Sequence, residues 1–230
     1  MQIKALDPFN PDQAFPDPAQ ALREPDGLLA YGGCLSASRL LNAYRHGIFP
    51  WYNPGEPILW WSPNPRLVLF PEHLKVTRSL QKTLRKQLFV IHYNRSFAQV
   101  MAACAAPRSA QGGTWISPDI LSAYTNLHQL GWAHSVEAWR DNELVGGLYG
   151  VAIGRVFFGE SMFHRETDAS KVVFVEMVKQ LHSWGYELID CQVSSPHLLS
   201  LGAEEIPRAE FQSLLKRYCG LAPEPLAWRL

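Results

Sequence analysis

The chain has 230 residues, of which 47% are hydrophobic and 18% are charged, and its acidic and basic residues balance to a formal net charge of zero. This composition is typical of a globular protein, and no run approaches the roughly 18 consecutive apolar residues of a membrane-spanning helix. The N-terminus carries acids and prolines where a secretory signal needs basic residues and an apolar stretch. We therefore expect a cytoplasmic protein that does not enter a membrane.

The first quarter of the chain, through about Trp61, is rich in proline, glycine and tryptophan. Ser36 or Ser38 is a candidate N-cap, and Gly47 a candidate stop, for a short helix. The prolines of the next segment, 48–66, argue against a long helix or a central strand and predict an extended aromatic segment. The change in composition predicts a small N-terminal α/β domain over residues 1–62 and a second domain over residues 63–230.

Acidic residues are absent between His73 and Pro118, a stretch that holds seven Lys or Arg residues, Arg95 and Arg108 among them. Thr77 is a candidate N-cap for a helix with Leu80, Leu84 and Leu88 on one face. The other side would present Lys75, Arg78, Lys82, Arg85 and Lys86. Solvated helix faces usually mix charges of both signs. A stripe of one sign instead favours binding to a nucleic-acid backbone, although an ordinary exposed helix remains the alternative.

Helix and strand signals follow in regular order. They predict a strand over 88–93, helices over 97–106 and 120–130, a hairpin of 133–140 and 143–153, and a strand over 155–163. A helix from Asp168 or Ser170 to Gly185 and a strand over 186–193 follow. A short helix between Ser195 and Gly202 and a last helix over 207–218 complete the chain. This order excludes a repeat array and a purely alternating barrel. It predicts an α+β protein whose second domain resembles the mixed-sheet acyl-CoA N-acyltransferase (GNAT-like) fold.

Motifs for other chemistries are missing. No glycine lies between Gly159 and the following helix, so the glycine-rich pyrophosphate loop expected for coenzyme A is absent. No G-x-S-x-G, H-E-x-x-H, P-loop or dinucleotide motif occurs, and the four cysteines form no C-x-x-C pair. We therefore expect an acyl donor other than coenzyme A, no metal and no cofactor.

Long strings of residues resemble one family, the leucyl/phenylalanyl-tRNA–protein transferases, from about Phe15 to Arg208. The matching strings are ALREPDGLLAYGG, RLLNAYRHGIFPWY, ILWWSPNPR, GTWI, AYTNLHQLGWAHSVEAW, LVGGLYGVAIGRVFFGESMF, ASK, LIDCQV and SLGAEEIPR. The resemblance implies a monomeric enzyme that moves Leu or Phe, and less often Met, from aminoacyl-tRNA as co-substrate. The acceptors would be proteins with N-terminal Arg or Lys, which the transfer marks for N-end rule degradation. A sister transferase with another acceptor, or an inactive tRNA-binding module, remains an alternative.

The resemblance also assigns a site. Asp190 and Gln192 stand two apart on a predicted strand, so their side chains emerge on one face, with Cys191 on the other. The family resemblance implies that Gln192 contacts the attacking amine, that Asp190 polarises Gln192 and that Glu160 binds an amino group. Water, Asp190 or the ribose could take the amine proton.

The remaining predicted site residues would hold the aminoacyl end of the tRNA. The resemblance implies that the terminal adenosine is surrounded by Trp51, Trp115 and Tyr124. It implies an apolar pocket for the Leu or Phe side chain, lined by Leu148, Phe174, Met177 and Ile189. By the same resemblance, the site is completed by Tyr44, Gly159 and Ser195. Two positions depart from the family pattern. Cys34 stands where Asp is expected, and Ser195 where Asn or Thr is expected.

Overall fold

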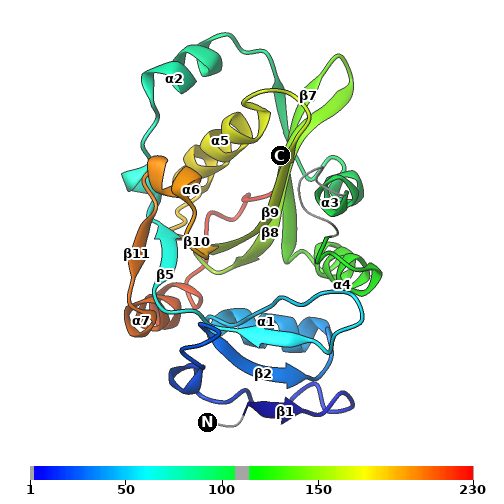
Figure 1. Cartoon of the computed structure of the whole chain (residues 1–230). Coiled ribbons are helices and arrows are strands. Elements are labelled where there is room, and N and C mark those ends of the chain that lie inside the picture. The colour runs from blue at the N-terminus through cyan, green and yellow to red at the C-terminus, as the bar shows by residue number, and fades with distance from the viewer. Residues whose placement is uncertain (1–2, 107–113, 230) are drawn as a thin grey trace.

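The computed structural model describes residues 3–106 and 114–229. The N-terminal part is a four-stranded sheet in the order β1-β2-β4-β3. Its strands are β1 (Lys4–Leu6), β2 (Leu28–Gly32), β3 (Phe49–Pro50) and β4 (Leu59–Trp61). Helix α1 (Ala37–Arg45), capped by Ser36, lies on the side of this sheet that faces the rest of the molecule (Figure 1). The prediction that prolines exclude a central strand here was wrong, because the prolines flank β4, which lies between β2 and β3.

The larger sheet has seven strands in the order β11-β5-β10-β9-β8-β7-β6. They are β5 (Arg66–Leu69), β6 (Val90–Tyr93), β7 (Ala133–Arg140), β8 (Glu143–Ile153), β9 (Val156–His164), β10 (Leu188–Gln192) and β11 (Glu204–Ile206). Strands β7, β8 and β9 are antiparallel, as predicted, whereas β10 runs parallel to β9. Asp141 and Asn142 both have positive φ, which is the turn geometry that suits a tight hairpin. The predicted α+β fold with a mixed sheet is confirmed.

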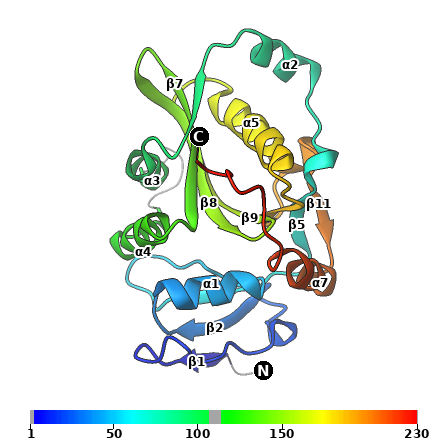
Figure 2. The same ribbon diagram turned by 180° about the vertical axis from the view of Figure 1, so that it is seen from behind.

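Helices cover both faces of the larger sheet (Figures 1 and 2). They are α2 (Arg78–Arg85), α3 (Phe97–Ala105), α4 (Pro118–Gln129), α5 (Ala169–Ser183), α6 (Pro196–Ser200) and α7 (Arg208–Tyr218). Residues of α1, α3, α4 and α7 share one hydrophobic core, and α5 packs on the opposite face of the sheet in a second core. Within the described residues, no helix is both long and apolar enough to cross a membrane.

The end of the chain returns to the body of the molecule after α7 (Figure 2). Trp228 stacks on His134 with ring centroids 4.2 Å apart, and its ring also lies 5.1 Å from Trp184 and 5.6 Å from Phe157. Its Nε1–H donates to the Tyr186 hydroxyl at 2.8 Å. The tail is therefore held by a set of aromatic contacts.

Local signals predicted the helices well, and short strands poorly. Thr77 caps α2 through its hydroxyl, which accepts from the Leu80 N–H at 3.3 Å. Leu88 was predicted on the same helix face as Leu80 and Leu84, but the helix ends at Arg85 and Leu88 is 43% exposed. Strands β5 and β11 were not predicted at all. They extend the sheet beyond β10, and β5 brings Arg66 beside the predicted site.

Candidate active site

Glu160, in the middle of β9, is the point where four elements converge. The hydroxyls of Tyr44 on α1 and Tyr124 on α4 donate to its carboxylate at 2.7 and 3.0 Å, and also hydrogen-bond each other. The side-chain amide of Gln192, at the end of β10, donates to the same carboxylate at 2.9 Å. Both tyrosines are fully buried. The carboxylate is therefore fixed from three sides by donors from both parts of the chain.

This environment changes the acidity of Glu160. Burial raises the pKa of its carboxyl to about 7, and the nearby charge of Asp190 acts in the same direction. The hydrogen bonds from Tyr44, Tyr124 and Gln192 act against this, since they stabilise the ionised form and lower the pKa. A group that titrates near neutral pH can both accept and release a proton under physiological conditions.

We expect Tyr124→Phe to raise the pKa of Glu160 by about half a unit to one unit, because the change removes a donor to the ionised carboxylate. The pKa can be followed by ¹³C NMR of side-chain-labelled glutamate across a pH titration. Tyr149→Phe is the matched control. Tyr149 is also fully buried, and its hydroxyl has no hydrogen-bond partner within the described residues. An unchanged Glu160 pKa in Tyr124→Phe, or an equal shift in both variants, would contradict this account.

Asp190 is fully buried and paired with an arginine that the sequence did not predict. Arg66 Nε and Nη2 donate to its two carboxylate oxygens at 2.8 and 2.6 Å. The backbone N–H of Gln192 also donates to Asp190, at 2.9 Å. Cys191 packs on the side of the sheet that α5 covers. The prediction that Cys191 lies on the opposite face of this strand from Asp190 and Gln192 is therefore confirmed. However, Asp190 contacts the backbone of Gln192, whereas the polarising role implied by the resemblance would act on its side chain.

A small cavity of about 210 Å³ opens next to Glu160 and Gln192. It is lined by Phe49, Pro50, Trp51, Trp115, Glu160, Gln192 and Val193. Trp51 is 48% exposed and packs beside Trp61, with ring centroids 5.7 Å apart. The structure thus gathers Trp51, Trp115, Glu160 and Gln192, all of which were predicted for the site. An exposed tryptophan at a cavity rim offers a flat surface on which a base can stack.

Other predicted residues lie outside this cavity. Tyr44 and Tyr124 sit behind Glu160, so neither ring is open to a nucleoside in this structure. Ser195 stands at the N-cap of α6 without a side-chain capping bond, and Gly159 lies against the Asp190 carbonyl. The four apolar residues of the predicted side-chain pocket, Leu148, Phe174, Met177 and Ile189, are buried in the core between the sheet and α5. Their contact with an aminoacyl group stays a prediction.

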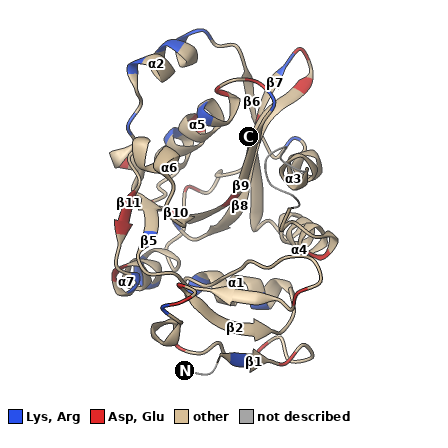
Figure 3. Cartoon of the chain, in the orientation of Figure 1, with Lys and Arg blue, Asp and Glu red and all other residues tan. Residues whose placement is uncertain are grey.

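The basic residues around α2 form an exposed surface of one sign, visible in blue in Figure 3. All five predicted residues, Lys75, Arg78, Lys82, Arg85 and Lys86, are exposed. Within the described residues, none of them forms an ion pair with an acidic side chain. Helix α2 is attached to α5 through the Thr83 hydroxyl, which donates to Asp168 at 3.4 Å. Arg108 lies outside the described residues.

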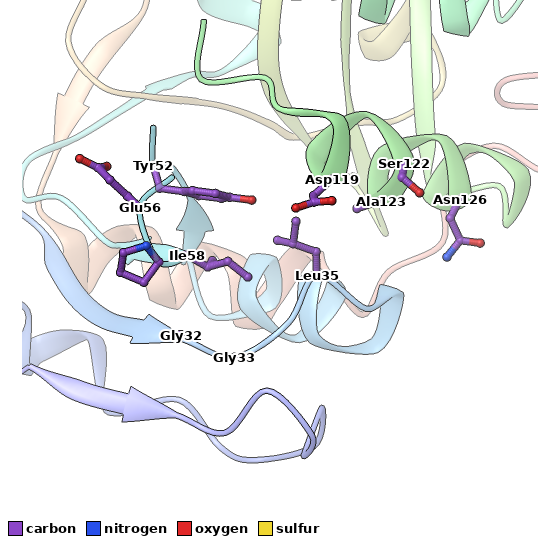
Figure 4. Close-up of a pocket in the computed structure, with 11 residues that line it drawn as sticks. Gly32, Gly33, Leu35, Tyr52, Glu56, Ile58, Asp119, Ser122, Ala123 and Asn126 are labelled. Atoms are coloured by element: carbon purple, nitrogen blue, oxygen red, sulfur yellow. The ribbon is translucent and has the colours of Figure 1, made fainter. Parts of the chain in front are cut away.

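A wider groove has a different lining. It measures about 790 Å³ and separates the N-terminal sheet from α4 (Figure 4). Tyr52, Glu56, Asp119 and Asn126 contribute polar groups to its walls, but it contains none of the predicted site residues. The part of the chain that is described also holds no group of three His, Cys, Asp or Glu residues that could bind a metal ion. The predicted residues Trp51, Trp115, Glu160 and Gln192 line the smaller cavity instead.

Comparisons of the sequence with known families and proteins agree on one family. The sequence matches the family described as leucyl/phenylalanyl-tRNA protein transferase over residues 68–216, and the N-terminal domain of that family over residues 33–64. A leucyl/phenylalanyl-tRNA–protein transferase of Methylococcus capsulatus is 58% identical over 227 residues, which cover 99% of this chain and 97% of the relative. One from Nitrosomonas europaea is 59% identical over 217 residues, covering 94% of this chain and 92% of the relative.

Among solved structures, a GCN5-related N-acetyltransferase from Kribbella flavida aligns with a TM-score of 0.39 at 13% identity, covering 72% of this chain and 59% of that one. The sequence matches are much stronger and extend over nearly the whole length of both partners. The chain belongs to the leucyl/phenylalanyl-tRNA–protein transferase family.

Proposed function

We propose that this protein transfers Leu or Phe, and less readily Met, from aminoacyl-tRNA to the α-amine of proteins that begin with Arg or Lys. The new N-terminal residue would mark those proteins for N-end rule degradation. The observation that carries the proposal is the Glu160–Gln192 hydrogen bond on the wall of a cavity rimmed by Trp51 and Trp115. The family relationship supports the choice of donor, and the α2 surface supports RNA as its carrier.

The reaction requires little beyond positioning and proton transfer. An aminoacyl ester is already activated, and an N-terminal α-amine has a pKa of about 7.7 to 8.0, so a weak base is enough to give the free amine. The amine nitrogen attacks the ester carbonyl, a C–N bond forms and the C–O bond to the terminal ribose breaks. The proton lost by the amine balances the proton gained by the ribose oxygen. No covalent enzyme intermediate is needed.

Two side chains at the cavity wall, Gln192 and Glu160, can orient the amine and transfer its proton. The amide nitrogen of Gln192 is bound to Glu160, which leaves its carbonyl oxygen to accept an N–H from the attacking amine and so orient it. A carboxamide is a poor proton acceptor, so a second group must take the proton. Asp190 is enclosed by Arg66 and by the Gln192 backbone. We therefore assign to Glu160 the binding of the amino group and the proton transfer from the amine to the ribose oxygen.

Specificity for the transferred residue would come from apolar surface. Leu148, Phe174, Met177 and Ile189 carry no polar group, so they would exclude charged and polar side chains while separating Leu from Met only weakly. Because all four are packed together in the core, a Leu or Phe side chain could enter only if the space between α5 and the sheet widened. An N-terminal Arg or Lys on the acceptor would be favoured electrostatically by the carboxylate of Glu160.

The proposal is tested by mixing purified protein with tRNA charged with radiolabelled Leu and with peptides that begin with Arg, Lys, Asp or Ala. Transfer of label to the Arg and Lys peptides alone supports it. Transfer to the Asp peptide would instead indicate a sister transferase with different acceptor specificity. Binding of tRNA without transfer to any peptide would indicate an RNA-binding module without activity.

The α2 surface gives a prediction of its own. We expect Lys82→Ala/Lys86→Ala to weaken binding of charged tRNA and to reduce the slope of log K against log salt concentration by roughly 0.7–0.9 for each phosphate that is no longer neutralised. Binding can be measured by filter retention or fluorescence anisotropy at several salt concentrations. Lys4→Ala/Lys216→Ala removes the same two charges from β1 and α7 and should leave the slope unchanged. Equal slopes for both double variants would place the RNA elsewhere.

A further inference from the structure

We propose that Arg66 is a positioning residue, which fixes Gln192 through Asp190 and ties that position to the N-terminal domain. Its role in transfer rests on the function proposed above, whereas its role in holding Gln192 can be measured without transfer. Arg66 lies on β5, away from the cavity, and its side chain is only 1% exposed. It cannot touch substrate in this structure, so any influence on the reaction must pass through its neighbours.

All three nitrogens of the Arg66 guanidinium donate a hydrogen bond, and two aromatic rings lie close to it. Nε and Nη2 bind the two oxygens of Asp190, and Nη1 donates to the Gly47 carbonyl at 3.2 Å. The ring of Phe49 lies 4.8 Å from the guanidinium carbon and the ring of Phe211 lies 4.7 Å from it. A planar cation that packs against two rings and bonds a carboxylate through one edge has little freedom to turn. Arg66 therefore restricts the orientation of Asp190 as well.

Asp190 in turn controls the backbone of Gln192. Its Oδ1 accepts from both Arg66 Nε and the Gln192 N–H, at 2.8 and 2.9 Å. Gln192 has φ of 64°, a left-handed conformation that a non-glycine residue adopts only at a cost. The pairing of β10 with β5 also shifts register between Asp190 and Gln192. The hydrogen bond to Asp190 stabilises this turn, and the turn points the Gln192 amide at Glu160.

Through its hydrogen bond to the Gly47 carbonyl, Arg66 also contacts the N-terminal domain. Gly47 follows α1, the helix that carries Tyr44, and a methyl group at Gly47 would lie 2.9 Å from Phe211. The Arg66 guanidinium thus bonds both to Gly47, just after α1, and to Asp190, near the end of β10. These two ends carry Tyr44 and Gln192, both donors to Glu160. The structure assigns to Arg66 the alignment of the two donors that approach the carboxylate from different parts of the chain.

We expect Arg66→Lys and Arg66→Met to lower kcat for transfer about 10- to 100-fold, because a misplaced Gln192 no longer orients the amine. KM for the peptide and for charged tRNA should change less than about threefold, since neither substrate touches Arg66. Lysine retains the charge but lacks the planar fork, so it should not restore kcat. Arg155→Met is the matched control, because Arg155 also pairs with a carboxylate, Glu187, but is 36% exposed. It should retain wild-type kcat.

The double variant Arg66→Met/Asp190→Asn separates positioning from a general structural role. Arg66→Met alone leaves a buried carboxylate without its cation and could prevent folding, whereas the double variant removes both charges. If the effect of Arg66 on Gln192 passes through Asp190, the double variant should have a kcat close to that of Asp190→Asn alone, within about twofold. If the loss caused by Arg66→Met instead multiplies that of Asp190→Asn, Arg66 does not position Gln192 through Asp190 and that proposal is overturned.

A measurement that needs no transfer separates failure of this proposal from failure of the proposed function. Hydrogen exchange at the Gln192 backbone amide should speed up about tenfold or more in Arg66→Lys and should stay unchanged in Arg155→Met. Unchanged exchange in Arg66→Lys would overturn the proposal even if the protein is an active transferase. Faster exchange in a protein that transfers nothing would uphold the positioning of Gln192 and would reject the proposed function instead.

Discussion

Replacing Glu160 with glutamine is expected to lower kcat for transfer of Leu to a peptide beginning with Arg by about 10²- to 10⁴-fold, which is the usual contribution of a general base. Glutamine retains the size of the side chain and can still hydrogen-bond to Tyr44, Tyr124 and Gln192. It cannot accept the amine proton. Because burial raises the pKa of Glu160 to about 7, the wild-type rate should also rise with pH through this value, as the carboxylate ionises. In the variant this rise should be absent, and only the later rise from deprotonation of the peptide amine, at about pH 7.7 to 8.0, should remain.

Single-turnover rates measured with preformed Leu-tRNA between pH 5.5 and 9 would test both expectations. Glu166→Gln is a suitable control, because Glu166 lies just beyond the same strand and pairs with Arg140 at 2.9 Å on the surface. A Glu160→Gln enzyme with more than about a third of the wild-type rate would exclude Glu160 as the proton acceptor. A higher KM at unchanged kcat would reduce its role to binding the amino group.

Trp228→Ala should lower the free energy of unfolding by about 3 kcal/mol, a value typical of the loss of a large packed aromatic side chain. The truncated side chain would no longer pack on His134, Trp184 and Phe157 or donate a hydrogen bond to Tyr186. Burial lowers the pKa of His134 to about 3, so Trp228 stacks on a neutral imidazole at physiological pH. This neutral ring would be left open to water in the variant.

Urea unfolding followed by far-UV circular dichroism gives the required free energies. The control is Leu226→Ala, two residues away, where the side chain is 66% exposed and the expected loss is within about 0.5 kcal/mol. If Trp228→Ala and Leu226→Ala cost the same, or if Trp228→Ala costs less than about 1 kcal/mol, the aromatic contacts of the tail do not stabilise the fold.

The parts of the fold that sequence could predict are those specified locally. Ser36, Thr77 and Ser117 cap their helices with their own side chains, and Asp141 and Asn142 supply the two positive φ angles of the hairpin. Such features depend on a few neighbouring residues. Strands β5 and β11 depend on partners far along the chain, and segments of only four and three residues carry too little pattern to show where they pair.

The site residues also differ in whether the sequence could predict them. Strand alternation put Asp190 and Gln192 on one face, and family resemblance supplied Glu160, Trp51 and Trp115. The partner of Asp190 was missed: the apolar run LVLF after the prolines fits a strand, but nothing local indicates that the arginine before it meets a carboxylate 124 positions away. The enclosed positions of Tyr44 and Tyr124 behind Glu160 also could not be predicted, since they depend on how α1 and α4 pack together.

The separation of Arg66 from Asp190 along the chain also affects when the enzyme can become active. The two residues are 124 positions apart, and the strands that carry them pair directly. A ribosome makes the chain from its N-terminus, so Arg66 emerges as a cation long before the carboxylate that neutralises it has been translated. A nascent chain with a complete basic helix α2 would therefore still lack an aligned Gln192. Competence to use charged tRNA would arise only near the end of synthesis.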